Sequence, residues 1–243
     1  MAFLVTPGAL SREEPFYLSI RRIIAERIER GDYPAGVALP SENELADEFG
    51  CTRLTVRNAV GELVDRGFVR RVQGKGAFVV SLWDGAEATG MGFREMVRVH
   101  DAEPSVRILS RSRRLAGPLF ADLFGVDPED EVYGVRRLNS VNGVPVSIES
   151  ALIPLELFPA IEVMDVAVFS LYETYAMYGH EVVGTQEVLG LTELSARDAG
   201  LLRVRAGDPA MTLDCVSYDS DGRAVEYVRA LNLGDRGGYV YTY

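Results

Sequence analysis

The sequence predicts an α+β fold in two domains, and three observations lead to this prediction. Apolar residues recur at helical spacing early in the chain, whereas strand-like runs joined by Asx-Gly turns dominate later. The length of 243 residues suits two modest domains. The charge is also divided: residues 1–80 carry 11 basic and 11 acidic side chains, and residues 81–243 carry 14 and 25.

These observations define the expected domains. Residues 12–80 form a small domain of helices followed by a β-hairpin, and residues 81–92 form a linker. Residues 93–243 form a mixed α/β domain whose sheet is largely antiparallel, because hairpins connect its strands.

The composition narrows the class of protein. Hydrophobic residues make up 47% and charged residues 25%, an ordinary globular balance that excludes disordered and fibrous chains. The two cysteines, Cys51 and Cys215, do not form a metal-ligand pattern and fit a reducing compartment. The first residues lack the basic start of a signal peptide, and no stretch is long enough to span a membrane. We therefore expect a soluble, cytoplasmic protein without cofactor or metal.

The N-terminal domain begins with two predicted helices. The first starts at Pro15 and ends at Gly31, because isoleucines recur between them at helical spacing. The second starts at a capping box formed by Ser41 and Glu44 and ends at Gly50.

A third helix follows closely, with Thr52 as its N-cap and Gly67 after its end. Two short helices joined by a glycine turn indicate a helix-turn-helix. Arg53 and Arg57 lie four residues apart and so share one face of this helix, opposite its apolar stripe. Thr55 lies at the same end. A helix N-terminus favours phosphate, and arginine can reach guanine edges, although a solvated helix face can also carry two arginines.

A β-hairpin is predicted next, from strands 68–72 and 77–80 around the turn Gln73-Gly74-Lys75-Gly76. A helix-turn-helix followed by a hairpin is a winged helix. Lys75 is the only lysine in the chain. It lies at the hairpin tip, where the flanking glycines allow a close approach to a DNA backbone.

The C-terminal domain alternates between strands and short helices. Helix, strand, Asx-Gly turn and strand occur in this order twice, at Asn142-Gly143 and Asp221-Gly222, which indicates a weak internal duplication. The predicted strands are 106–115, 132–141, 144–153, 182–191, 210–218 and 224–233, and the predicted helices are 119–124, 170–178 and 196–202.

The run from Phe16 to Val80 resembles the DNA-binding domain of GntR-family bacterial transcription regulators. Leu39–Ala46, Thr52–Arg57 and Gly67–Gly76 carry the resemblance. It implies DNA contacts by the matching residues and by the wing tip, where the isolated lysine adds a candidate. The candidate DNA-binding residues are Asn43, Thr52, Arg53, Thr55, Arg57, Gly74 and Lys75.

The second region resembles the UTRA effector domain of the HutC subfamily, on residues 137–149, 170–173 and 224–227. The resemblance implies a fold related to chorismate lyase and a pocket for a small polar metabolite. Asn139 stands where many relatives that bind phosphorylated sugars have a second arginine, which favours a carboxylate over a phosphate. Two alternatives to a pocket remain. Glu149 and Glu226 can be solvated residues that point outward from their strands, and Arg137 can form a structural ion pair with an acidic neighbour. The candidate effector-binding residues are Arg137, Asn139, Glu149, Ser170 and Glu226.

Three function classes compete to account for these sequence features. A ligand-responsive repressor that dimerises through residues 93–243, binds a palindromic operator and is released by a small polar metabolite fits both resemblances. A lyase-like enzyme using the C-terminal pocket is the alternative, although the sequence has no nucleophile motif, metal-ligand cluster or phosphate loop. A protein-interaction module would leave Arg53 and Arg57 unexplained.

Overall fold

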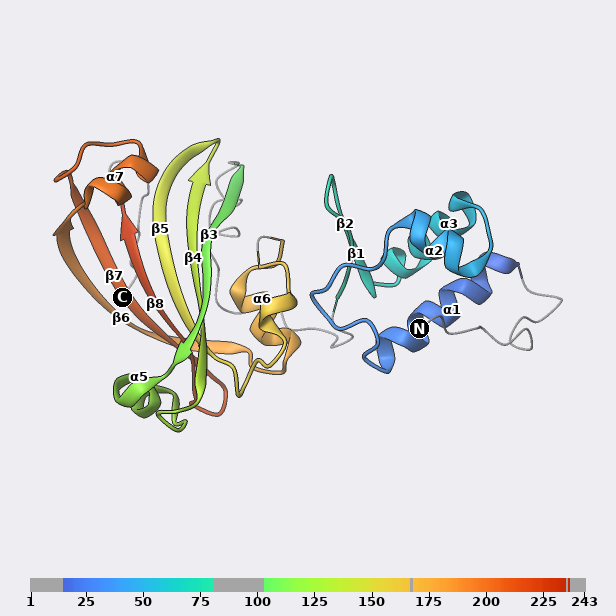
Figure 1. Cartoon of the computed structure of the whole chain (residues 1–243), viewed down its shortest axis with the longest axis horizontal. Helices are drawn as coiled ribbons and strands as arrows, with labels where there is room; N and C mark the ends of the chain where they lie inside the picture. Colours follow the sequence, from blue (N-terminus) through green and yellow to red (C-terminus); the bar gives the residue numbers. More distant parts are fainter. Residues whose placement is uncertain (1–14, 81–102, 167, 235, 237–243) are drawn as a thin grey trace. The chain divides into compact units, whose positions relative to one another are not determined.

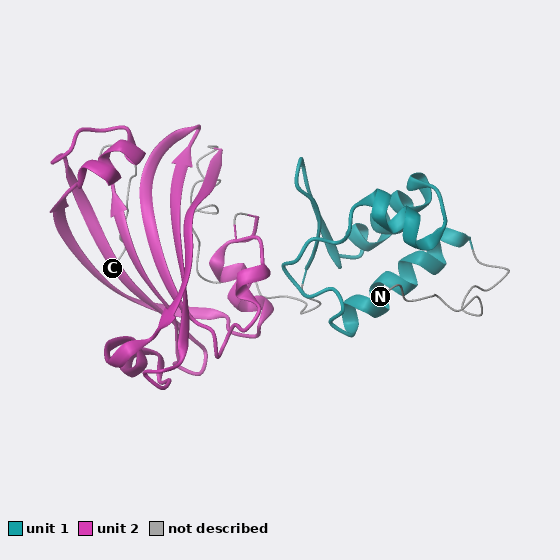
Figure 2. Ribbon diagram, viewed as in Figure 1, with its two compact units in different colours: residues 1–84 teal, residues 85–243 magenta. Residues whose placement is uncertain are grey.

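The computed structural model describes residues 15–80, 103–166, 168–234 and 236. The chain divides into two compact units, residues 1–84 and residues 85–243 (Figure 2). The linker predicted for residues 81–92 lies outside the described residues, as do the first residues expected in each domain, 12–14 and 93–102.

Unit 1 is a three-helix domain with a two-stranded antiparallel hairpin, as predicted. Its elements are α1 (Phe16–Glu29), α2 (Glu42–Phe49), α3 (Arg53–Asp65), β1 (Val69–Val72) and β2 (Gly76–Val79). The isoleucines of α1 are buried against apolar residues of the other two helices and the hairpin. This small core holds α3 and the hairpin in a fixed relation.

The predicted helix ends of unit 1 are confirmed. The Ser41 hydroxyl accepts the Glu44 N–H at 3.2 Å, and the Glu44 carboxylate accepts the Ser41 N–H at 2.8 Å. Gly50 has a φ of 61°, the left-handed conformation that lets the chain turn sharply after α2. Two residues later the Thr52 hydroxyl caps α3 by accepting the Thr55 N–H. The turn and the caps fix where α3 begins.

Unit 2 is built on one six-stranded antiparallel sheet with the order β3-β4-β5-β8-β7-β6. The strands are β3 (Pro104–Leu115), β4 (Glu131–Val141), β5 (Val144–Pro154), β6 (Val182–Glu193), β7 (Pro209–Asp219) and β8 (Ala224–Asn232). The helices are α5 (Gly117–Phe124), α6 (Leu171–Met177) and α7 (Ala196–Leu202), with a 3₁₀ turn η1 (Ile161–Val163) that the sequence did not predict.

The helices cover the two faces of the sheet unequally. Apolar residues of α5 and α7 pack against one face, at its two ends (Figure 1). Helix α6 packs against residues of the opposite face, among them Tyr133 and Ile153. We call the latter the α6 face.

The strand order contains a repeat. The successions β3-α5-β4-β5 and β6-α7-β7-β8 are alike, and β5 pairs with β8 at the centre. The duplication indicated by the sequence therefore has a counterpart in the topology. It makes β3 and β6 the equivalent outer strands. No helix in the described part of the chain is long and apolar enough to cross a membrane.

Candidate functional site

The N-terminal end of α3 presents two threonines. The hydroxyls of Thr52 and Thr55 lie 2.9 Å apart, and the Thr52 hydroxyl also accepts the Thr55 N–H. Both threonines lie at the surface, and they hold the first turn of α3 in place. A capped helix start with exposed hydroxyls offers hydrogen-bond donors to a phosphate.

Three arginines meet at one carboxylate, that of Glu42 at the start of α2. The Nε and Nη2 atoms of Arg57 donate to Glu42 at 3.1 and 2.8 Å. The Nη2 of Arg53 lies 3.5 Å from the carboxylate, and the Nη2 of Arg71 lies 3.7 Å from it. We call Arg53, Arg57 and Arg71 the arginine cluster. Arg71 comes from the hairpin strand β1, and its Nη2 also donates to the Arg57 carbonyl at 3.1 Å.

The charges of this group do not cancel. Hydrogen bonds from Arg57 hold the pKa of Glu42 below its usual range, so the carboxylate is ionised near neutral pH. One negative charge then faces three guanidinium groups, and a net positive surface remains. Each guanidinium has five N–H donors. Arg57 donates to Glu42 through its Nε and Nη2 atoms, and its other N–H donors can bind a phosphate or a guanine.

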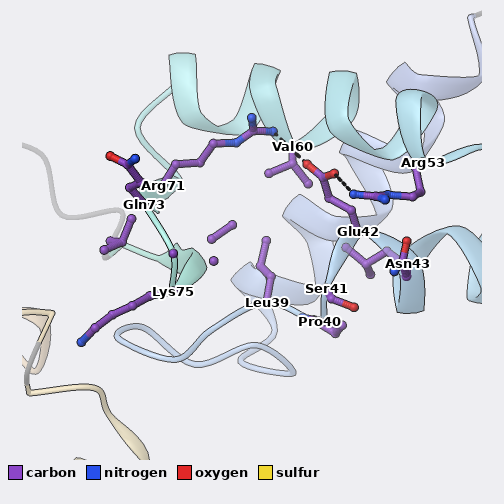
Figure 3. Close-up of a pocket in the computed structure, with 15 residues that line it drawn as sticks. Leu39, Pro40, Ser41, Glu42, Asn43, Arg53, Val60, Arg71, Gln73 and Lys75 are labelled. Atoms are coloured by element: carbon purple, nitrogen blue, oxygen red, sulfur yellow. Dashed lines mark hydrogen bonds and ion pairs between the residues drawn. The ribbon is translucent and has the colours of Figure 1, made fainter.

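A groove of about 650 Å³ runs between the start of α2 and the hairpin (Figure 3). Asn43, Arg53, Gly74 and Lys75 line it, together with Arg71. Figure 3 shows Glu42 with dashed contacts to Arg53 and Arg71, and the Lys75 side chain extending away from them. Four of the seven predicted DNA-binding residues thus surround one groove.

The other three predicted DNA-binding residues, Thr52, Thr55 and Arg57, do not line the groove but lie in the first turns of α3. At the hairpin tip, Gly74 has a φ of 75°, which few other residues adopt. The Lys75 N–H closes the turn onto the Val72 carbonyl at 3.0 Å. The backbone therefore fixes where the lysine side chain starts.

Sequence reasoning missed Glu42 and Arg71. Glu42 lies 15 residues from Arg57, so helical spacing gives no sign of their contact. Arg71 was counted only as a strand residue. The strand pattern could have indicated Arg71, because Arg71 is one of the two exposed residues in the middle of β1.

In unit 2, four of the five predicted effector-binding residues lie on the α6 face. Arg137 and Glu149 are direct partners on β4 and β5, and their Nη2 and Oε2 atoms lie 2.5 Å apart. The two side chains are only 11% and 17% exposed. Asn139 pairs with Ser147 and donates to its hydroxyl at 3.1 Å.

Glu226 is a buried carboxylate held by hydroxyl groups. It accepts hydrogen bonds from Tyr175 of α6 at 2.6 Å and from Ser217 of β7 at 2.8 Å. The Tyr172 hydroxyl lies 3.0 Å from that of Ser217 and extends the network. Burial raises the pKa of Glu226, although these hydrogen bonds and the positive charge of Arg137 act against the rise. We call Arg137, Asn139, Glu149 and Glu226 the polar cluster.

Ser170, the fifth predicted residue, caps α6. Its hydroxyl accepts the Glu173 N–H at 3.0 Å, and the Glu173 carboxylate returns a bond to the Ser170 N–H at 2.7 Å. Within the described residues, no hydrogen bond joins Ser170 to the polar cluster. Ser170 thus positions the helix that carries Tyr172 and Tyr175.

Two atoms of the polar cluster are buried without a hydrogen-bond partner in the described part of the chain: Nε of Arg137 and Oδ1 of Asn139. One is a donor and the other an acceptor. Buried polar groups are rarely left in this state, because each costs the free energy of desolvation. A polar molecule with both an acceptor and a donor would satisfy them.

Across the described ranges, no group of three or more histidine, cysteine, aspartate or glutamate side chains is arranged to hold a metal ion.

The sequence does not predict the neighbours of Glu226, which are Tyr172, Tyr175 and Ser217. Glu226 and Tyr175, for example, are 51 residues apart. Only the fold of the sheet under α6 brings them together.

Two family matches cover most of the chain. Residues 16–79 match the family described as bacterial regulatory proteins, gntR family, and residues 100–237 match the UTRA domain. Both resemblances drawn from the sequence are thereby confirmed.

Individual relatives match over nearly their full length. The chain is 26% identical over 229 residues to the HTH-type transcriptional repressor NagR of Bacillus subtilis, covering 93% of this chain and 94% of that protein. It is 30% identical to the mannosyl-D-glycerate transport/metabolism system repressor MngR of Escherichia coli, covering 91% and 93%. The crystal structure of PhnF from Mycobacterium smegmatis matches with a TM-score of 0.61 and 27% identity, covering 92% and 98%.

Proposed function

We propose a function from one premise: the chain belongs to the gntR family of bacterial regulatory proteins and carries a UTRA domain. It is a transcription regulator and not an enzyme, because its family and the relatives it matches are regulators. The finer proposal is that it represses transcription as a homodimer on a palindromic operator and is released by a small polar metabolite.

The arginine cluster is the observation that best supports DNA binding. Arg53 and Arg57 of α3 and Arg71 of the hairpin meet at Glu42, so the helix and the wing present their positive charge together. We assign base and phosphate contacts to α3 and a backbone contact to Lys75 at the wing tip. One such domain reads one half-site. Two copies are needed for a palindrome, and this supports the homodimer.

The polar cluster supports the metabolite. The guanidinium of Arg137 favours an anionic group, and Glu149 and Glu226 favour hydroxyl or amine groups. Asn139 adds no positive charge, so we assign a carboxylate rather than a phosphate to the ligand. The name of the MngR relative includes mannosyl-D-glycerate, a hydroxylated carboxylate, which agrees with this chemistry.

The proposed operator binding is tested by a gel shift against the DNA upstream of the gene. Arg53→Ala and Arg57→Ala should each weaken operator binding about 5- to 150-fold per half-site, which corresponds to about 1–3 kcal/mol. Arg30→Ala is the matched control, since Arg30 is exposed at the end of α1 and pairs only locally with Asp32. Operator affinity that survives both α3 substitutions would refute the assignment.

The proposed metabolite binding is tested by thermal-shift screening of small hydroxylated carboxylates and amines. Each compound that binds is then added to an operator titration. Arg137→Ala should bind the operator as the wild type does but no longer respond to the ligand. A variant that responds like the wild type would show that the ligand binds elsewhere.

A further inference from the structure

Leu54 is a large apolar side chain at the surface of α3. It is the second residue of this helix, and it is 64% exposed. In the described part of unit 1, the only other large apolar side chain that is exposed is Phe16, at 39%. The buried apolar cluster of unit 1 is built from other residues. Packing inside this unit therefore does not explain why position 54 is a leucine.

The helix places Leu54 among the groups that we assign to DNA. Leu54 and Arg57 lie three residues apart, so they are neighbours on one face of α3. Asn58, one turn after Leu54, is exposed as well. The buried face of α3 lies on the other side of the helix and consists of Val56, Ala59, Val60 and Leu63. The leucine is thus an apolar group within a polar, positively charged surface.

The face of α3 that carries Leu54 is open. Gly61 follows seven residues later, about two turns along the same face. A Cβ atom on Gly61 would have no atom within 4 Å apart from the backbone of α3 itself and any residue outside the described part of the chain. Glycine inside a helix lowers its stability relative to alanine, and no neighbour requires it here. Another molecule can therefore approach this face closely.

Duplex DNA offers few apolar partners for such a leucine. The phosphates are charged, and the base edges in the major groove carry hydrogen-bond donors and acceptors. The C5-methyl group of thymine is the apolar group exposed there. A single exposed leucine is common on protein surfaces, so exposure alone assigns nothing. The position of Leu54 beside Arg53 and Arg57 provides the assignment.

We propose that Leu54 contacts the C5-methyl group of one thymine in the major groove of each half-site, and so selects an A·T pair beside the base contacts of Arg53 and Arg57. This proposal rests on the operator binding of the proposed function and specifies one base pair of the operator. A contact of Leu54 with a deoxyribose is the competing arrangement. It would strengthen binding without any dependence on the thymine methyl group.

Deoxyuridine separates the two arrangements. Uracil keeps every hydrogen-bonding group of thymine and lacks only the C5-methyl group. Losing the burial of one methyl group should weaken binding about fourfold per half-site, which corresponds to about 0.8 kcal/mol. If the two half-sites act independently, their losses multiply to about 16-fold in a symmetric operator.

The test uses the full chain and the shortest upstream duplex that the wild type shifts. Each thymine is replaced by deoxyuridine in turn, at both symmetric positions together, and binding is measured by fluorescence anisotropy. The wild type should lose affinity at one thymine of each half-site. Leu54→Ala should bind the thymine and deoxyuridine duplexes equally, with about the affinity that the wild type has for the deoxyuridine duplex.

Two further variants serve as controls. Leu119→Ala is the matched one, because Leu119 is 74% exposed on α5 in unit 2, which holds none of the proposed DNA contacts. It should show the same deoxyuridine effect as the wild type. Leu54→Met keeps a long apolar side chain and should retain the effect. Because Leu54 is exposed, Leu54→Ala should unfold at the same temperature as the wild type.

The outcomes separate this proposal from the proposed function. A wild type that shifts no upstream duplex would overturn both. A wild type that binds the operator but loses affinity at no deoxyuridine position would overturn the Leu54 contact alone. The same holds if Leu54→Ala keeps the full deoxyuridine effect, because the methyl group would then be read by another residue.

Discussion

Glu42 sets the positions of three arginines at once, yet its negative charge repels the phosphates of DNA. Glu42→Gln keeps an acceptor oxygen but removes the charge that holds the arginine cluster together. We expect specific operator binding to weaken about 5- to 150-fold, while binding to unrelated DNA strengthens because one negative charge is lost. Competition gel shifts with operator and scrambled duplexes measure both affinities.

Asp47→Asn is the charge-matched control for this change. Asp47 is exposed on the same helix and has no contact with the arginine cluster. It should strengthen both affinities slightly and leave their ratio unchanged. If Glu42→Gln behaves like Asp47→Asn, then Glu42 does not position the arginines.

Glu226 makes stability depend on pH. Because burial raises its pKa, the folded protein binds this proton more tightly than the unfolded chain does. Stability should therefore fall as the pH rises from the unfolded value, about 4.3, through the folded pKa. Glu226→Gln removes the charge, so its melting temperature should exceed that of the wild type by an amount that grows over this range.

Melting curves between about pH 4.5 and 8 measure this difference. The control is Glu129→Gln, because Glu129 is an exposed carboxyl in a turn. Its curve should run parallel to that of the wild type. Parallel curves for Glu226→Gln as well would contradict the assigned pKa direction.

The placement of residues could be predicted where it follows local spacing. Arg53 and Arg57 reach the same carboxylate because helical geometry places them on one face, and Ser41 and Glu44 form the predicted capping box, which spans three residues. Glu42 and Tyr175 were not found, because their partners are distant in sequence. Local patterns do not contain contacts that only the fold creates.

At the scale of elements, every predicted helix and strand is present with ends that differ by only a few residues. Their ends carry strong local signals, such as the Asn142-Gly143 turn and the Ser170 cap. The η1 turn is too short to show a helical spacing of apolar residues, and it has no side-chain cap hydrogen bond. Its sequence therefore gives no sign of it. The strand order could not be predicted either, because hairpins fix only neighbouring strands.

The cap of α6 leads to a prediction that separates two roles of Ser170. Ser170→Ala should lower the free energy of unfolding by about 1 kcal/mol, the usual loss for a serine N-cap. Ser195→Ala is the matched control, since Ser195 caps α7 on the opposite face of the sheet. Urea denaturation should show similar losses for both.

The ligand response then distinguishes the two caps. A response reduced in Ser170→Ala alone supports the predicted effector contact, whereas equal responses leave Ser170 as a cap. An unchanged free energy of unfolding in Ser170→Ala would contradict its capping role.

At the scale of the whole molecule, the two proposed sites lie in different units. The DNA-binding candidates belong to residues 1–84 and the polar cluster to residues 85–243. We therefore expect a metabolite in unit 2 to affect DNA binding by shifting an equilibrium between arrangements of the proposed dimer that differ in operator affinity. The charge division along the sequence agrees with this separation, since the excess of acidic residues belongs to the unit that holds the proposed metabolite site.

This coupling has to be reciprocal. If the metabolite lowers operator affinity by some factor, operator DNA must lower metabolite affinity by the same factor. Calorimetric titration of the metabolite into the protein, with and without a saturating operator duplex, measures the second factor, and a gel-shift titration measures the first. A scrambled duplex at equal concentration is the control, because it adds the same charge without fixing the spacing of the half-sites. If operator and scrambled DNA lower the metabolite affinity equally, the metabolite competes with DNA directly at the DNA surface. Arg137→Ala should then still be released from the operator, whereas reciprocal coupling through the polar cluster predicts that it stays bound.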